Sequence, residues 1–253
     1  MYVSITSIKG DMELVNVVCL YWGNKYKTDY LKVLYSMVQR HLTIPHKFII
    51  YTDHVKMHKL VPGDNVEVRK LPFHTYTGWW NKLTLFSEEA KLEGTCLYFD
   101  LDVVIVDNID CFVTYGNEKP EQFVGMNDFN RHTKMFNSSV MKFNNKIMTK
   151  YVWQEYLKDK KTFDRLQGDQ NVISQTIKKT SHYTSFPDEW TFSAKWYDRD
   201  QPRFHREKWN FERKPGAKVA IFHGKPNPNE LVNPHPHESY DEKTTEWVKN
   251  HWK

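Results

Sequence analysis

The most apolar stretch of the chain, residues 95–106 (TCLYFDLDVVIV), is interrupted only by Asp100 and Asp102. A run of this kind is typical of a strand that is buried on both faces of a parallel sheet. Burying two carboxylates costs several kcal/mol unless a cation or strong hydrogen-bond donors compensate them. We therefore expect a fold in which this strand is central and its aspartates meet a positive partner.

Other apolar runs in the first half of the chain alternate with amphipathic stretches. Residues 15–21 (VNVVCLY), 46–52 and 66–71 are predicted strands. Residues 28–41 carry apolar side chains at helical spacing, and 79–92 form a second predicted helix, which Gly94 would end. Strands that alternate with helices predict an α/β fold with a Rossmann-like, mostly parallel sheet flanked by helices.

The second half of the chain has a more mixed pattern. Its predicted strands are residues 122–126, 138–143 and 218–222, and its predicted helices are 148–157, 169–178 and 244–252. No linker separates the two halves, residues 14–125 and 126–253, so we predict a single domain over 1–253.

The charge balance argues against a nucleic-acid partner. The net charge of +5 arises from 36 basic and 31 acidic residues. A nucleic-acid surface needs a clustered basic stripe. The nearest candidate, residues 199–218, also contains the acidic residues Asp200, Glu207 and Glu212, and Asp198 lies just before it. We interpret this segment as a solvated loop.

The sequence also carries no membrane or secretion signal. No apolar stretch approaches the roughly 18 residues that a membrane helix needs, and the N-terminus lacks a basic region followed by an apolar run. The three cysteines form no CxxC pair that would indicate zinc. We expect a cytoplasmic protein without a transmembrane segment, with peripheral attachment to a membrane left open.

The spacing of Asp100 and Asp102 suggests a metal site. Side chains two apart on a strand point to the same side, so both carboxylates could face one hard divalent cation such as Mn²⁺ or Mg²⁺. Such a cation can bridge a diphosphate and stabilise it as it leaves. The alternative is that the two aspartates cap turns or pair with Lys or Arg.

A second polar group, His223-Gly224-Lys225, follows the predicted strand 218–222. A neutral imidazole is a suitable third ligand for Mn²⁺. Gly224 would let backbone amides approach a phosphate, and Lys225 would offer it a positive charge. The alternative is a plain turn, with the histidine bonded to a backbone carbonyl.

Polar residues in the second half could bind a sugar. Asn137 and Ser138 supply the hydrogen bonds that sugar hydroxyls need, and Asp169 and Gln170 lie at a predicted helix start. For Asp169, capping of that helix is a competing explanation. For the strand around Asn137, the alternative is an ordinary core strand without a role in sugar binding.

Aromatic and polar residues in the first half could complete a ligand site. Trp79 and Trp80 precede Lys82, which suggests a lysine on the donor side of a site with ring walls, or else two core tryptophans. Tyr21 and Asp53 end or follow the first two predicted strands. Ligands of open α/β sheets bind beyond the carboxyl ends of the strands, so a base and ribose would lie there.

Taken together, these motifs resemble the GT-A glycosyltransferases, and most closely the glycogenin and lipopolysaccharide-galactosyltransferase-like group, which retains anomeric configuration. The resemblance covers residues 15–228, and its stretches follow the family order: VVCLYWGNKY, FIIYTD, GWWNKL, YFDLDVVI, FNSSVMKF, GDQNVI and FHGKPNP. It implies the GT-A fold, with 14–125 as the nucleotide-sugar-binding half and 126–253 as the acceptor half.

The resemblance also implies roles for individual residues. Mn²⁺, or Mg²⁺, would be ligated by Asp100, Asp102 and His223. The donor would be bound by Tyr21, Asp53, Lys82, Asn137, Ser138, Gly224 and Lys225. Catalytic roles would fall to Asp169, which would contact the sugar hydroxyls, and Gln170, near the anomeric carbon. The family usually has a glycine where this chain has Ser139, a departure that could narrow the sugar pocket.

The implied activity is that of a hexosyl- or other glycosyltransferase, which moves a sugar from a nucleotide-diphosphate donor to a hydroxyl group. The donor is often a UDP-sugar, and a guanosine donor stays open. The acceptor would be a glycan, a lipid-linked sugar or a protein side chain, contacted by residues in 131–135 and 190–209. A front-side, retaining route is expected, and an inverting route would need a base among Asp128, Asp169 and Asp188.

Two alternatives lead to different functions. A nucleotidyltransferase also uses paired aspartates and a divalent cation, but it usually carries a Gly-rich phosphate loop that residues 21–24 (YWGN) lack. A non-catalytic carbohydrate-binding scaffold would keep the fold without the chemistry. The complete Asp-Asp-His set argues against the scaffold.

Overall fold

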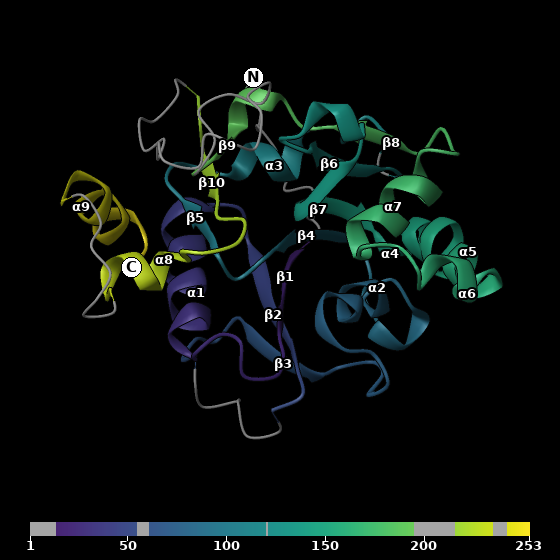
Figure 1. Cartoon of the computed structure of the whole chain (residues 1–253), viewed down its shortest axis with the longest axis horizontal. Helices are drawn as coiled ribbons and strands as arrows, with labels where there is room; N and C mark the ends of the chain where they lie inside the picture. Colours follow the sequence, from purple (N-terminus) through teal and green to yellow (C-terminus); the bar gives the residue numbers. More distant parts are fainter. Residues whose placement is uncertain (1–13, 55–60, 120, 195–215, 235–241) are drawn as a thin grey trace, which may run out of the picture.

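A computed structural model of the chain describes residues 14–54, 61–119, 121–194, 216–234 and 242–253 (Figure 1). The predicted solvated loop, residues 199–218, lies outside this set except for its last three residues. Residues 195–209 of the predicted acceptor segments also lie outside it.

Four parallel strands form the first part of the main sheet, with β1 (Val15–Tyr21) between β2 (His46–Thr52) and β4 (Thr95–Phe99). β3 (Val66–Lys70) pairs with the outer side of β2. The strands β1 and β2 have the predicted bounds, because continuous apolar runs with β-branched residues suit strands covered on both faces. Their carboxyl ends, and that of β4, lie at one edge of the sheet.

Antiparallel pairing extends this sheet across the second half of the chain. β7 (Phe136–Asn144) pairs with β4 and with β6 (Phe123–Asn127), and β8 (Tyr183–Ser185) runs parallel to β6. The strand order is β3-β2-β1-β4-β7-β6-β8. The predicted boundary at 125/126 falls inside β6, so the two predicted halves share one sheet and belong to one domain.

The predicted strand 95–106 is wrong in one respect, because the chain bends at Asp100 to Asp102. β4 ends at Phe99, and β5 (Val103–Ile105) joins a second sheet of order β5-β10-β9. This second sheet contains β9 (Thr191–Ser193) and β10 (Val219–Ile221), and β5 pairs with β10. The expectation that strand alternation orients the two aspartates is therefore wrong. The bend instead places them close to the segment that follows β10.

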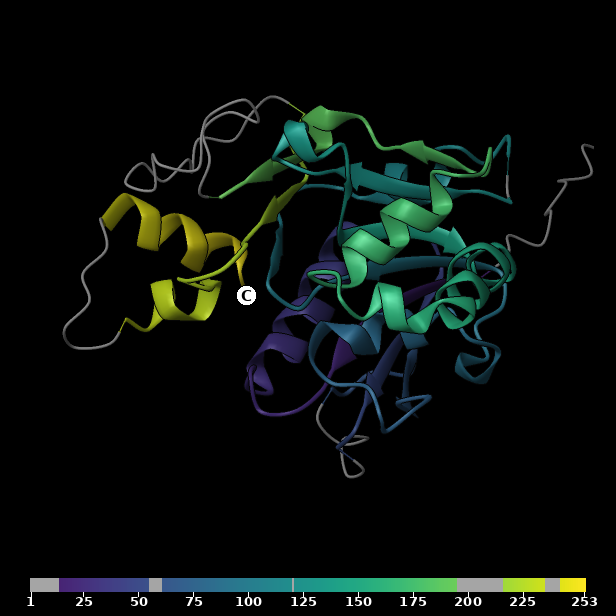
Figure 2. The ribbon, with the colours of Figure 1, turned by 45° about the vertical axis from the view of Figure 1, so that its right-hand side comes forward.

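Helices cover both faces of the main sheet. α1 (Asp29–His41), which has nearly the predicted bounds, packs in a core with Val17 and Cys19. Val18 and Leu20 face a second core on the opposite side, as expected for a strand with alternating side chains. α8 (Pro228–Val232) and α9 (Glu242–His251) lie on the α1 side, and the short helices of residues 145–177 lie on the other (Figures 1 and 2).

The predicted helix 79–92 is wrong, because the segment forms a 3₁₀ turn (Gly78–Trp80), the single helical turn α2 (Asn81–Thr84) and another 3₁₀ turn (Glu88–Ala90). Hydroxyl groups compete with the helix, since Thr84 Oγ1 donates to the Asn81 carbonyl and Ser87 Oγ to the Thr84 carbonyl. All apolar side chains of the segment from Leu83 onward are buried, so its conformation follows the surrounding core.

The remaining helices are short, except near the C-terminus and the site. α7 (Asp169–Ile177) and α9 confirm the predicted helices 169–178 and 244–252. The predicted helix 148–157 is a π-helical turn (Thr149–Trp153) followed by α5 (Gln154–Lys158). The others are α3 (Asp110–Thr114), α4 (Asn145–Met148) and α6 (Lys160–Phe163). No helix in the described ranges combines the length and the apolar character needed to cross a membrane.

Candidate active site

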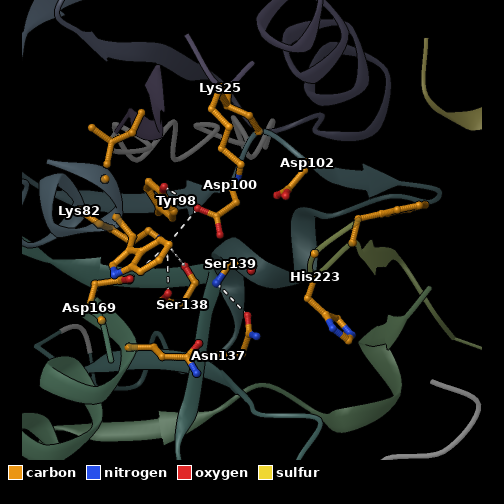
Figure 3. Close-up of a pocket in the computed structure, with 18 of the residues that line it drawn as sticks. Lys25, Lys82, Tyr98, Asp100, Asp102, Asn137, Ser138, Ser139, Asp169 and His223 are labelled. Atoms are coloured by element: carbon orange, nitrogen blue, oxygen red, sulfur yellow. Dashed lines mark hydrogen bonds and ion pairs between the residues drawn. The ribbon is translucent and has the colours of Figure 1, made fainter. Parts of the chain in front are cut away.

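A cavity of about 410 Å³ opens at the carboxyl edge of the main sheet (Figure 3). Its walls come from the ends of β1 and β4, the bend after β4, β7, the start of α7 and the segment after β10. The predicted site residues among its lining are Lys82, Asp100, Asp102, Asn137, Ser138, Asp169, Gln170, His223 and Gly224. The fold thus brings nine of the twelve predicted site residues to one cavity.

Lys82 is the centre of a buried ionic cluster in this cavity. It belongs to α2, and it is 5% exposed. Its Nζ lies 2.9 Å from Asp100 Oδ1 and 3.3 Å from Asp169 Oδ2, and it donates to Ser138 Oγ at 3.0 Å. Burial alone would lower the pKa of Lys82, but the two carboxylates outweigh it and raise that pKa. Lys82 is therefore a fixed positive charge within the wall.

Two carboxylates and one ammonium leave this cluster with excess negative charge. Tyr98 donates to Asp100 Oδ1 at 2.7 Å, whereas Asp169 Oδ2 is buried with an ion pair but no hydrogen bond. Asp169 is the first residue of α7, and its side chain does not cap that helix, whose N-cap position is Gly168. The capping explanation for Asp169 is therefore wrong, and its carboxylate faces the cavity.

Asp102 lies in the same bend as Asp100 but has a different partner. Tyr26 donates its hydroxyl hydrogen to Asp102 Oδ2 at 2.7 Å. Burial, and then the like charge of Asp100, raises the pKa of Asp102 to about 6, although Tyr26 and Lys25 act in the opposite direction. The bend thus concentrates negative charge that a bound cation would compensate.

His223 reaches the cavity from the loop after β10, and its ring points away from the two aspartates in Figure 3. Its Nε2 lies 2.6 Å from Ser193 Oγ, and its ring stacks on Phe129 with the centroids 5.7 Å apart. Among the described residues, no three His, Cys, Asp or Glu side chains are grouped to hold a metal ion. The donor types fit Mn²⁺, but the imidazole would have to turn to join the carboxylates.

Asn137, Ser138 and Ser139 line the cavity from β7. The Ser139 amide donates to Asn137 Oδ1 at 3.0 Å, which orients the amide side chain. The Ser139 carbonyl accepts from the Asp100 amide at 2.9 Å. The residue that departs from the family pattern therefore lies at the point where β7 meets the bend.

Three of the predicted ligand-binding residues lie outside the cavity lining. Tyr21 is 5% exposed and packs on His54, with ring centroids 5.1 Å apart. Asp53 accepts the Gly23 amide at 3.1 Å, and the Lys225 Nζ lies 3.3 Å from Glu230 Oε1. Their roles in nucleotide and diphosphate binding stay predictions. Trp190, within a predicted acceptor segment, is partly buried and packs against the core residue Phe112 and against Tyr115.

Several lining residues were not predicted. Tyr98 could have been found, because it lies two positions before Asp100 and strand alternation places both on one face. Lys25 and Tyr26 come from the loop after β1, and no local pattern relates them to a bend more than 70 residues later. Gln167 and Asn171, at the start of α7, also line the cavity.

No family model and no curated protein sequence matches this chain, but solved structures do. The galactosyltransferase LgtC, in complex with donor and acceptor sugar analogs, aligns with a TM-score of 0.60 at 15% identity, over 94% of this chain and 96% of that chain. The chain has the GT-A fold. The glycosyltransferase GlyE of Streptococcus pneumoniae gives a TM-score of 0.67 at 15% identity, over 92% of this chain and 59% of that chain. The bifunctional glycosyltransferase WbbM gives a TM-score of 0.59 at 14% identity, over 85% of this chain and 46% of that chain.

Proposed function

We propose that this protein is a metal-dependent glycosyltransferase that moves a hexosyl group from a nucleotide-diphosphate donor, with UDP as the expected nucleotide, to a hydroxyl acceptor. The observation that carries the proposal is the cavity in which Lys82 joins Asp100, Asp169 and Ser138 beside Asp102. The cavity lies at the strand ends where open α/β sheets bind ligands, and the structures that share this fold are glycosyltransferases.

Asp100, Asp102 and His223 would hold Mn²⁺, or Mg²⁺ in its place. Bound there, the metal would supply positive charge to the donor diphosphate as it becomes the leaving group. Gly224 is exposed and has a φ of 76°, a conformation that leaves its backbone open to a phosphate. Lys225 would add a second positive charge after exchanging its partner Glu230 for that phosphate.

The sugar of the donor would lie against the Lys82 cluster. Lys82 and Asp169 can each bond a hydroxyl group, and Asn137 and Ser138 line the same wall. A neutral sugar hydroxyl can both donate and accept, so it suits a wall in which ammonium and carboxylate groups alternate. Gln170, next to Asp169 in the lining, would lie near the anomeric carbon.

A front-side route is the reaction that these residues favour. The bond between C1 and the phosphate oxygen breaks, the acceptor oxygen bonds to C1 on the same face, and the acceptor proton passes to the departing phosphate oxygen. Asp128 and Asp188, two candidate bases for inversion, do not line the cavity. Asp128 accepts from Thr133, and Asp188 accepts from Asn127 at 3.0 Å. Asp169, the third, is paired with Lys82.

A screen of nucleotide sugars tests this proposal. Release of nucleoside diphosphate is measured for each donor with Mn²⁺, with Mg²⁺ and with EDTA, first without an acceptor. We expect slow, Mn²⁺-dependent hydrolysis of one donor, lost in Asp102→Ala and kept in the surface control Asp164→Ala. Release of pyrophosphate from a nucleoside triphosphate would favour a nucleotidyltransferase. Failure of every donor to turn over or to raise the melting temperature with Mn²⁺ would favour a non-catalytic scaffold.

A further inference from the structure

The adjacent residues Trp79 and Trp80 have opposite environments. Trp80 packs against the core beside Tyr156, with ring centroids 6.3 Å apart. Trp79 is 57% exposed, more than any other large apolar side chain in the described ranges, and it lines the cavity. A large exposed ring at the mouth of a polar cavity indicates a contact surface rather than a packing residue.

The Trp79 ring is held against the start of α7. A Cβ atom on Gly168 would lie 2.8 Å from Trp79 Nε1 and 2.9 Å from Cδ1. The indole edge therefore rests against a backbone that only glycine leaves open. Because Gly168 directly precedes Asp169 at the start of α7, the ring lies next to the segment that carries the Asp169 carboxylate.

Amide side chains line the same cavity as this ring. Gln167, Gln170 and Asn171 flank Gly168 in sequence and line the same cavity. A pyranose ring has an apolar C–H face and a rim of hydroxyl groups. The C–H face suits stacking on an indole, and the rim suits amides, which both donate and accept.

We propose that Trp79 is the platform on which the acceptor binds, and that this acceptor is a pyranose-containing glycan. The proposal rests on the proposed function, because it assigns the donor sugar to the deep wall of Lys82, Ser138 and Asp169, which are each 5–6% exposed. The second substrate then enters above the first, at the exposed mouth. Trp22, at the end of β1, also lines the cavity and lies where the fold would bind the base, so Trp79 is left for the acceptor.

Acceptor kinetics test this assignment. With the donor found in the screen, nucleoside diphosphate release is measured at increasing lactose, maltose, cellobiose and the methyl pyranosides of glucose and galactose. For any acceptor that accelerates release, we expect Trp79→Ala to raise the acceptor KM by about tenfold and the donor KM less than twofold. Trp79→Phe keeps a flat ring and should stay within about threefold of the wild type. Tyr183→Ala, which removes an exposed ring away from the cavity, should have no effect.

A glycan array gives a readout that does not depend on turnover. Wild type and Asp102→Ala should bind the same pyranosides. Trp79→Ala should no longer bind these pyranosides, and Gly168→Ala should bind them more weakly because its Cβ displaces the indole. Equal binding by Trp79→Ala and wild type, or wild-type binding to none of the glycans, would overturn the proposal, as would an increase in donor KM equal to that in acceptor KM. Failure of the proposed function is a separate result, because the wild type would then hydrolyse no donor.

Discussion

The two sides of the cavity differ in how completely they are assembled. On the side proposed to bind the donor sugar, called the sugar side below, Lys82 already contacts Asp100, Asp169 and Ser138 within 3.3 Å. On the side proposed to bind the metal, called the metal side below, Asp102 bonds to Tyr26 and His223 bonds to Ser193, and no three candidate ligands are grouped in the described residues. The proposed sugar side is preorganised, whereas the proposed metal side would have to rearrange.

The origin of each side explains this difference. Three residues of the sugar side, Lys82, Ser138 and Asp169, belong to α2, β7 and α7, and Asp100 directly follows β4. The metal side depends on the bend between the two sheets and on the loop that follows β10. Loops can change conformation without breaking a core, so assembly of the metal site can be coupled to donor binding.

Loss of Asp102 should produce the largest effect on activity. For Asp102→Asn, which keeps the size of the side chain, we expect metal-dependent release of nucleoside diphosphate to fall by roughly 10²- to 10³-fold, because the leaving group loses its compensated charge. The melting temperature without metal should not fall, since the substitution removes a repulsion from Asp100. A decrease in melting temperature with activity retained would contradict the metal role.

Loss of Lys82 should produce the largest effect on stability. Lys82→Met leaves the Asp100 and Asp169 carboxylates without their shared cation, and we expect the free energy of unfolding to fall by about 3–5 kcal/mol. Lys82→Met combined with Asp169→Asn should recover part of that loss. Urea denaturation measures both. The surface substitution Lys160→Met, which breaks an exposed pair with Asp164, is the matched control and should change stability by less than about 1 kcal/mol.

The contribution of Asp102 to stability should depend on pH. Because the pKa of Asp102 is raised from 3.8 to about 6 in the folded state, the folded state holds this proton more tightly than the unfolded state. The contribution of Asp102 to stability is thus present below about pH 4 and lost as the pH rises through about 6. The free energy of unfolding of Asp102→Asn, measured by denaturation at each pH, should not show this decrease as the pH rises. Mn²⁺ affinity should change in the opposite direction and rise over the same interval, because the ligand must be deprotonated.

The smallest expected effect concerns Ser193. Ser193→Ala removes the hydroxyl group that bonds His223 Nε2. The imidazole then has no hydrogen bond to Ser193 to break when it turns to the metal. A net hydrogen-bond contribution of this kind corresponds to an about 2- to 10-fold lower Kd for Mn²⁺. Electron paramagnetic resonance of Mn²⁺ measures that Kd directly. An increase in Kd would indicate that Ser193 instead orients His223 for metal binding.

The strands that are buried on both faces could be predicted from the sequence. Residues 15–21 and 46–52 form β1 and β2 as predicted, because a continuous β-branched run in an α/β protein has few other solutions. The helical pattern of the segment 79–92 gave a wrong prediction, since its apolar residues from Leu83 onward are all buried and its conformation follows the surrounding core. The bend at Asp100 to Asp102 depends on the pairing of β5 with β10, which is more than 100 residues away.

The site was predictable to the extent that it lies at strand ends. Asp100 directly follows β4, Ser138 lies near the start of β7 and Asp169 begins α7. The structure places all three around Lys82. The sequence suggests a ring wall at Trp79 or Trp80, and Trp79 does line the cavity. Tyr26 could not be assigned, because its position depends on a loop that only the tertiary structure brings to the cavity. The hydrogen bond between His223 and Ser193 joins the loop after β10 to the end of β9, and no local pattern indicates it.

The most direct test is a crystal structure of the protein with Mn²⁺ and UDP. We predict that Mn²⁺ lies between Asp100, Asp102 and the diphosphate, that His223 has left Ser193 to complete the ligand set, and that the contacts of Lys82 with Asp100 and Asp169 are unchanged. Mn²⁺ bound elsewhere, or His223 still bonded to Ser193 with the diphosphate in place, would contradict the metal site. A rearranged Lys82 cluster would contradict the contrast between the two sides.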